Sequence, residues 1–376
     1  MDVATFFKNS NQPVITYRYN TYAVIESYFK ELSARITFAE SSLEVLGTSV
    51  LGKPVYGLKI GSSGSKILMW SQMHGNESTM TRSLFLWLEW VIENGFSTNV
   101  QLYIIPVLNP DGNDQWIRNN ANEVDLNRDA QDLSQPESQI LNTVIERFKP
   151  DLAFNLHDQR TIYGSKDGTQ AMQLSFLAPA ADVDRSVTDA RLRSMELINE
   201  IVSHCSGMMN HGIGRYDDAY NANCVGDALA TSQIPVVLFE AGHACDDYNR
   251  DTTTVIMARA LSHAIDYDSN EEYTEDTALT LERYNSIPQI ATTYCDMYLK
   301  NVPSINGRVA IAIMYKELIK NETLYYVPYI TSVNDTTIKN GHRVIDLASY
   351  ELEDLDFEIT TNQEITSSLL EINSFC

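Results

Sequence analysis

The stretch Lys66-Ile-Leu-Met-Trp-Ser-Gln-Met-His74-Gly-Asn-Glu77 decides the fold, because an apolar run leads there directly into a polar turn. The run at 66–72 is typical of a buried strand, and the apolar spacing at 77–94 is typical of an amphipathic helix. A strand followed at once by a helix is the repeating unit of α/β proteins. His74 and Glu77 lie in the turn between the two elements, where ligands gather in open α/β sheets.

The same alternation of strands and helices continues to about residue 268. Further strands are expected at 43–50, 54–60, 100–108, 151–156 and 235–240. Further helices are expected at 21–35, 136–149, 182–205 and 254–266. We therefore predict an α/β domain over residues 1–270, with a mixed central sheet that is flanked by helices on both faces.

The alternation of strand and helix patterns ends after this domain. Residues 271–305 are expected to form a helical connector, with one or two helices at 279–300. Two β-like runs follow, at 309–319 and 324–333, and the turn between them predicts a hairpin. With further strands at 342–345 and 357–361, residues 306–376 are expected to form a small β-rich C-terminal domain.

Composition and charge exclude several classes of partner. The chain has 376 residues, and 50 acidic against 27 basic side chains give a net charge of -23. Such a surface repels phosphates, so we expect neither nucleic acid nor an anionic membrane as a partner. No apolar run is long enough for a spanning helix, and the first residues lack the pattern of a secretory signal. The five cysteines are widely spaced and are expected to be reduced thiols, which favours the cytoplasm.

Histidine and glutamate at strand ends indicate a metal site. His74 and Glu77 are three residues apart, so one turn can direct both side chains to the same point. His157 ends another apolar strand, in Phe154-Asn-Leu-His157-Asp158, and would emerge at the same edge of the sheet. Two histidines and one glutamate with a long spacer form a zinc set that leaves a fourth position open for water. We expect one zinc ion per chain.

Five motifs in order resemble the zinc metallocarboxypeptidase family. They are His74-x-x-Glu77, Asn109-Pro-Asp-Gly112, Arg118 nine residues before Asn127-Arg128, His157 at a strand end, and Phe239-Glu240 closing an apolar strand. The resemblance covers roughly residues 15 to 268. It implies the carboxypeptidase fold and hydrolysis of the C-terminal peptide bond of a peptide.

The resemblance also implies roles for individual residues. His74, Glu77 and His157 would bind zinc, and Asp125 would orient His74 from outside the ligand set. Glu240 matches the glutamate that takes a proton from the water at the metal and passes it to the leaving amine.

The substrate side of the site follows the same pattern. Arg118 would stabilise the oxyanion, and Asn127 with Arg128 would hold the terminal carboxylate, for which a planar guanidinium is suited. The family has a mobile tyrosine about twenty residues before the catalytic glutamate. Tyr220 fits that place with one residue fewer, and Tyr216 is near enough to compete.

Two departures from the family pattern leave the substrate open. Arg128 is followed by Asp129-Ala-Gln, and Glu240 is followed by Ala-Gly-His243, so the side-chain preference of the well-known subgroups does not carry over. One alternative is a related zinc deacylase of the aspartoacylase or desuccinylase type, which would act on a small acyl-amino acid. Another is a zinc-free module that binds carboxylates.

Overall fold

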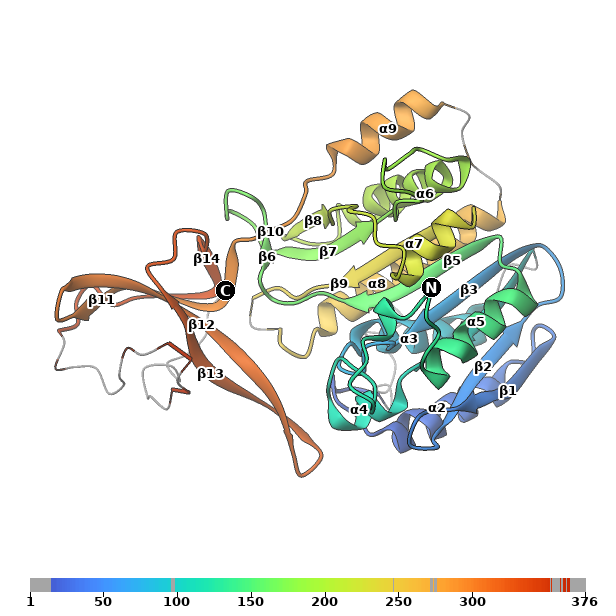
Figure 1. Ribbon diagram of the computed structural model, residues 1–376, viewed down its shortest axis with the longest axis horizontal. Helices are drawn as coiled ribbons and strands as arrows, with labels where there is room; N and C mark the ends of the chain where they lie inside the picture. Colours follow the sequence, from blue (N-terminus) through green and yellow to red (C-terminus); the bar gives the residue numbers. More distant parts are fainter. Residues whose placement is uncertain are drawn as a thin grey trace.

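The computed structural model describes residues 15–95, 99–245, 247–270, 273, 276–351, 353, 359, 361–362 and 364–365 of the chain. Two bodies are visible in Figure 1: a large α/β part, and a slender β part formed by strands that follow residue 290.

A mixed eight-stranded sheet forms the centre of the α/β part. Its strand order is β1-β2-β4-β3-β5-β9-β7-β8. The strands are β1 (Ser41–Thr48), β2 (Pro54–Ile60), β3 (Ser65–Ser71), β4 (Val100–Ile105), β5 (Leu152–Asp158), β7 (Met172–Leu177), β8 (Gly212–Arg215) and β9 (Val236–Ala241). β4, β3, β5 and β9 run parallel to one another, so their carboxyl ends meet at one edge. The run between β4 and β9 is the part of the sheet that can gather side chains from several strands at one point.

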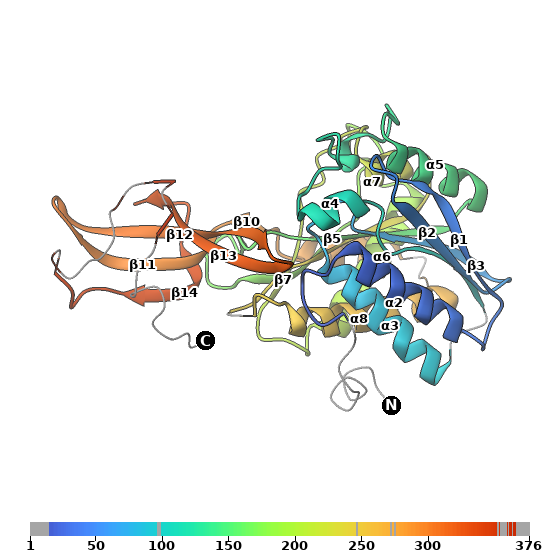
Figure 2. The same cartoon turned by 90° about the horizontal axis from the view of Figure 1, so that it is seen from below.

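Helices cover both faces of this sheet, as Figure 2 shows for α2, α3 and α8 on one side and α5 and α7 on the other. The helices are α2 (Tyr22–Arg35), α3 (Thr79–Asn94), α4 (Pro110–Gln115), α5 (Pro136–Phe148), α6 (Asp189–Cys205), α7 (Val225–Thr231), α8 (Asp251–Ser269) and α9 (Thr277–Ser286). A separate apolar core lies on each face. Strands buried on both faces read as continuous apolar runs, and this is why β3, β5 and β9 were predictable.

The predicted fold class is confirmed for the α/β part, but some elements escaped prediction. The short strands β7 and β8 and the short helices α4 and α7 carry too few periodic positions to stand out from the sequence. The pairing of β7 with β9 is antiparallel, which makes the sheet mixed at this side as well as at β1 and β2.

The prediction of helices over 279–300 is wrong beyond residue 286. α9 ends at Ser286, and the chain then forms β10 (Ala291–Thr292) and β11 (Tyr294–Ser304). The run of β11 has buried residues on both of its faces, so it lacks the strict alternation that identifies a half-buried strand. The expected helical connector at 271–305 is thus helical only in its first half.

A second, four-stranded sheet in the order β13-β12-β11-β14 forms the β part. It adds β12 (Gly307–Lys320), β13 (Thr323–Val333) and β14 (Asn340–Asp346) to β11. The structure contains the predicted hairpin, in which Lys320 pairs with Thr323. The expected strand at 357–361 lies largely outside the described residues.

Several contacts attach the β part to the α/β part, and two of them involve the ends of the β part. β10 pairs with β6 (Tyr163–Gly164), which follows β5 in the chain. At the end of the long hairpin, Arg18 donates a 2.5 Å hydrogen bond to Glu317, and the indole of Trp116 donates to the same carboxylate at 2.8 Å. The hairpin therefore brings a partly buried carboxylate to the body that carries the parallel strands.

The expectation that all five cysteines are reduced is wrong. Cys205, Cys224 and Cys295 are free thiols, whereas Cys245 is disulfide-bonded. Cys376 lies outside the described residues. Within the described part of the chain, none of the helices has the length and apolarity that a membrane span requires.

Candidate active site

The turn after β3 places His74 and Glu77. Gln72 takes a left-handed backbone conformation with φ 45°, and this ends the strand directly before the turn. A side chain at Gly75 would overlap the backbone of Gly112, because its Cβ would lie 2.0 Å from that residue's carbonyl carbon. Glycine is therefore required at position 75 by the close approach of α4, rather than by flexibility.

The Asn109-Pro-Asp-Gly112 motif supports this turn. Asn109 caps α4 by accepting a 2.8 Å hydrogen bond from the backbone N–H of Gly112, and it donates to the carbonyl of Met73 at 3.2 Å. The motif thus holds the residue before His74 in place, which explains its presence without a role in the chemistry.

Three buried side chains converge at the carboxyl edge of the sheet. The Nδ1 atoms of His74 and His157 lie 2.9 Å and 2.8 Å from the two carboxylate oxygens of Glu77. The potential ligand atoms of these three residues all lie within 4.8 Å of one another. The two histidines and the glutamate predicted from the sequence are therefore brought together.

The charges of this cluster oppose the cost of burial. Burial alone would raise the pKa of Glu77, but the two imidazoles hold it well below its ordinary value. Burial alone would lower the pKa of His74, but Glu77 and Asp125 raise it. Burial lowers the pKa of His157, and Glu77 opposes this effect only in part.

Asp125 lies outside the cluster, as the resemblance implies. Its carboxylate is 3.0 Å from Nε2 of His74, and its pKa is held below the ordinary value by His74 and Arg118 against the effect of burial. Arg118 contacts both Asp125 and the cluster. Its Nε lies 3.1 Å from Asp125, and one terminal nitrogen lies 3.2 Å from Glu77. A carboxylate behind a histidine fixes the ring and raises its basicity, which suits a metal ligand.

The three clustered residues fit a zinc ion. Two imidazoles and one carboxylate are a donor set for catalytic zinc, and the carboxylate behind His74 supplies the outer support. The Nε2 atom of His157 is buried without a hydrogen-bond partner among the described residues. A cation at the cluster would bind the other nitrogen, Nδ1, which faces Glu77, and the ring proton would then lie on Nε2.

Glu240 stands beside the cluster on the neighbouring strand. It is the cross-strand partner of His157 in the β5–β9 pairing and lines the same cavity. Burial raises its pKa well above the ordinary value, and the negative charges of Glu77 and Asp158 add to this effect. A carboxyl group that holds a proton readily is suited to act as a general base and then as a general acid.

Asn127 and Arg128 form a 3-10 turn (Leu126–Arg128) at the cavity wall. The amide oxygen of Asn127 accepts from the backbone N–H of Val225 at 3.1 Å. Arg128 donates to the carbonyl of Asn127 at 2.6 Å and to the Cys224 sulfur at 3.0 Å. It forms no ion pair with any acidic residue in the described part of the chain, although acidic residues are abundant.

The two candidate tyrosines lie differently. Tyr216 lines the cavity, and its ring packs edge-on against Tyr163 at 5.2 Å between centroids. The hydroxyl of Tyr220 lies 3.2 Å from that of Thr231, and Tyr220 is absent from the cavity lining. In this structure the competing Tyr216, rather than the expected Tyr220, faces the site.

Sequence reasoning missed several residues at this edge. Asp158 follows His157 directly. Arg250, which precedes α8, lies 3.7 Å from the Asp158 carboxylate. The exposed Arg160 lines the cavity. Only adjacency to His157 could have marked Asp158, whereas nothing in the sequence marks Arg250. His243, which follows Glu240 closely, stacks on His342 of β14 at 4.0 Å and is absent from the cavity lining.

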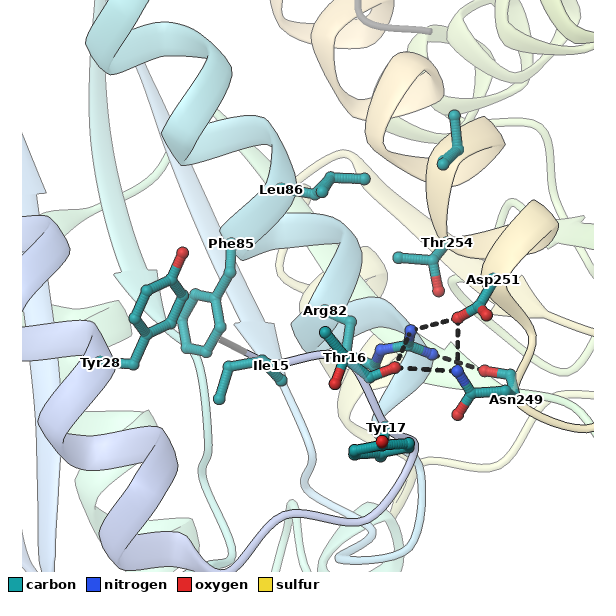
Figure 3. A pocket seen from close by; sticks show the side chains of 11 residues that line it. Ile15, Thr16, Tyr17, Tyr28, Arg82, Phe85, Leu86, Asn249, Asp251 and Thr254 are labelled. Carbon is teal, nitrogen blue, oxygen red and sulfur yellow. Dashed lines mark hydrogen bonds and ion pairs between the residues drawn. The ribbon is translucent and has the colours of Figure 1, made fainter. Parts of the chain in front are cut away.

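The cavity has a volume of about 310 Å³, and Arg118, Arg128 and Arg160 line it together with the metal cluster. Leu177, Pro179 and Leu238 provide apolar walls. A second cavity, of about 380 Å³, lies between α3, α8 and the segment before α2 (Figure 3). There Arg82 donates to the carbonyl of Thr16 and forms an ion pair with Asp251. That second cavity lacks a histidine, so the first is the candidate active site.

Comparison with known proteins agrees with this geometry. Residues 25–168 match the sequence model of a family described as zinc carboxypeptidase. That match includes the residues of the metal cluster but ends before Glu240. Carboxypeptidase SOL1 of Arabidopsis thaliana is 30% identical over 189 residues, which are 44% of this chain and 38% of that protein. The similarity therefore spans well under half of that relative.

Solved structures share the fold. A metallo-carboxypeptidase from Burkholderia cenocepacia has a TM-score of 0.54 at 15% identity, over 66% of this chain and 70% of that one. Carboxypeptidase A from Helicoverpa armigera has a TM-score of 0.55 at 16% identity, over 71% and 78%. At such identities the likeness concerns the fold alone. Residues 25–168 of this chain are thus similar in sequence to the zinc carboxypeptidase family, and the α/β part shares its fold with solved carboxypeptidases.

Proposed function

We propose that the protein is a zinc-dependent carboxypeptidase that hydrolyses the C-terminal peptide bond of peptides. The observation that carries this proposal is one cavity that contains both the cluster of His74, Glu77 and His157 and the guanidinium of Arg128. The cluster suits hydrolysis, and an arginine without an acidic partner suits a substrate that brings its own carboxylate.

His74, Glu77 and His157 would hold the zinc ion. The ion would supply a water of lowered pKa and would polarise the carbonyl of the scissile bond. The protein's contribution is to keep the three donors together, and Asp125 does this for His74 through the 3.0 Å contact with Nε2.

Glu240 would accept the proton from the attacking water and return it to the leaving amine. Its position beside His157 and its raised pKa support this role. Arg118 would stabilise the negative charge that develops on the carbonyl oxygen. Its side chain is about half exposed at the cavity, so it can turn from Glu77 and Asp125 towards a substrate.

Arg128 and Asn127 would bind the terminal carboxylate of the substrate. Arg128 has only a carbonyl and a thiol as hydrogen-bond acceptors among the described residues, so most of its donors are available. A planar guanidinium binds a carboxylate through two parallel hydrogen bonds, and a peptide with a free C-terminus offers that group.

The decisive experiment compares one peptide in its free-acid and C-terminally amidated forms. We expect amidation to lower kcat/KM roughly thirty- to a thousand-fold, since the charge-assisted contact with Arg128 is lost. Arg128→Lys should show much of the same defect on the free acid, because an ammonium group cannot reproduce the fork. Equal rates on the two peptides would refute the carboxypeptidase and leave a zinc hydrolase.

A zinc deacylase would be identified in the same assay by cleavage of an N-acylated amino acid but not of the peptide. Metal analysis tests the zinc-free binding module. We expect about one zinc per chain, and we expect His157→Ala to lose most of it. Full occupancy in that variant would remove His157 from the ligand set.

A further inference from the structure

Helix α3 begins directly after the metal ligand Glu77, yet its own sequence does not cap it. Ser78 occupies the N-cap position and makes no side-chain cap hydrogen bond. Its hydroxyl donates instead to the carbonyl of Arg18. The first backbone N–H groups of a helix lack partners within the helix, and leaving them buried and unpaired costs about 1 to 3 kcal/mol each.

The missing cap comes from another strand. One carboxylate oxygen of Asp158 accepts from the backbone N–H of Thr79 at 2.9 Å and from its hydroxyl at 2.5 Å. The other accepts from the backbone N–H of Met80 at 3.2 Å. Asp158 is the last residue of β5 and follows the ligand His157. One buried side chain therefore joins the segment after Glu77 to the segment after His157.

The backbone of Asp158 adds a second link. Its N–H donates to the Glu77 carboxylate at 3.2 Å, on the same oxygen that His157 approaches. Glu77 is thus held by a backbone donor beside His157, while its helix is held by the Asp158 carboxylate. These contacts fix how far Glu77 and His157 stand apart.

Arg250 contributes a third set of contacts. Its guanidinium donates to the carbonyl of Ala241 at 2.7 Å and to that of Gln159 at 3.0 Å, and it lies 3.7 Å from Asp158. Ala241 follows Glu240, so Arg250 joins the ends of β5 and β9 and compensates the charge of Asp158. Both side chains are almost entirely buried, at 4% and 3% exposure.

We propose that Asp158, supported by Arg250, is a positioning residue that sets the separation of Glu77 and His157 and thereby the affinity for zinc. This inference rests on the zinc site of the proposed function, but it concerns binding of the metal and not turnover. Residues outside the ligand set that orient ligands typically change metal affinity by about 10- to 100-fold when they are removed.

The test measures the zinc dissociation constant of the metal-depleted full-length chain by competition with a chelating indicator, together with Tm. Asp158→Ala removes every cap contact and should weaken zinc binding by about 10- to 100-fold. Asp158→Asn keeps the shape and one acceptor oxygen, so its defect should be smaller but measurable. The Asn variant also serves if the Ala variant does not fold.

Asp268 offers a matched control at the other end of the sheet. It is a buried carboxylate that accepts from Ser65, at the start of β3, and pairs with Arg193. Asp268→Asn should lower Tm as Asp158→Asn does, yet keep the wild-type zinc dissociation constant. If both Asn variants bind zinc like the wild type, or if both weaken it equally, Asp158 has no positioning role.

The outcomes also separate this inference from the proposed function. Zinc binding that depends on Asp158, in a protein that cleaves no peptide, would support the positioning role and overturn the carboxypeptidase. A wild-type chain that binds no zinc would overturn both.

Discussion

The charged side chains at the two sheets of this molecule have different kinds of partner. At the carboxyl edge of the eight-stranded sheet, the exposed guanidinium of Arg128 donates only to a carbonyl and a thiol among the described residues. In the four-stranded sheet, Asp296 accepts from the Tyr248 hydroxyl at 2.9 Å and from the backbone N–H of Tyr315 at 2.7 Å. Glu317 is also satisfied.

This difference distinguishes the candidate active site at the first sheet from the junction at which the second sheet is attached. A guanidinium that lines a cavity and has no acidic partner is available to a substrate carboxylate. Satisfied buried carboxylates at a junction hold two bodies in register. Substitutions at the first edge should therefore change activity, and substitutions at the second should change stability.

The largest expected effect is at the first edge. Glu240→Gln removes the proton acceptor but keeps the shape, so turnover should fall about 100- to 10,000-fold. Zinc content and Tm should equal those of the wild type. Near-normal turnover would mean that another group accepts the proton and that Glu240 belongs with the structural carboxylates.

Glu317→Gln should show the opposite behaviour. The charge that Arg18 and Trp116 contact is lost, and the buried guanidinium of Arg18 keeps only weaker partners. Because the Glu317 side chain is 25% exposed, we expect a loss of about 2 to 3 kcal/mol at most in the free energy of unfolding. Denaturant unfolding would measure it. A fall in kcat at temperatures where the variant is folded would show that the β part takes part in catalysis.

The stability of the junction between the two parts should also depend on pH. Burial lowers the pKa of His342 to about 4, whereas an unfolded histidine titrates near 6.5. As the pH falls below about 6.5, the unfolded chain takes up a proton that the folded chain refuses. Stability that is present above pH 6.5 is therefore lost towards pH 4, by about 2 kcal/mol at pH 5 from this group alone.

His342→Gln isolates that contribution. Glutamine can still meet the carbonyl of Thr161, which lies 2.7 Å from Nε2 of His342, but it does not titrate. The difference in unfolding free energy between variant and wild type should shrink from pH 7 to pH 5. A constant difference would show that His342 does not report on the junction. His243 and Arg250 lie close enough to influence the measured midpoint.

Residues of the candidate active site differ in whether the sequence could predict them. His74, Glu77 and His157 were predictable because strand ends in a parallel sheet meet at one edge, so short motifs far apart in sequence fall on one point. Asp158 and Arg250 were not, since a helix capped from another strand leaves no local signature. β11 has buried residues on both faces, which hides the alternation of a strand, and for this reason the sequence predicts a helix there.

Less of the β part could be predicted from the sequence. Its hairpin was predictable from the β-like runs on either side of Lys320-Asn-Glu-Thr, but its attachment was not. Glu317 lies in an ordinary alternating strand, and only the structure shows that it meets Arg18, 299 positions away. Long-range ion pairs of this kind have no periodicity to detect.

The smallest expected effect decides between the two tyrosines. Tyr216 follows β8, and its backbone N–H is tied to the carbonyl of Phe176 at 3.1 Å, so its ring is held at the cavity. One hydrogen bond to the substrate is worth about 0.5 to 1.5 kcal/mol. Tyr216→Phe should therefore lower kcat/KM roughly 2- to 10-fold. Tyr220→Phe is the matched control and should leave the rate unchanged, because its hydroxyl meets Thr231 instead. The reverse result would mean that the loop rearranges when a peptide binds and that the family's mobile tyrosine is Tyr220 after all. In that case substrate binding at the cavity would depend on movement of the tyrosine loop as well as on the guanidinium of Arg128. The contacts of the β part would by contrast be fixed.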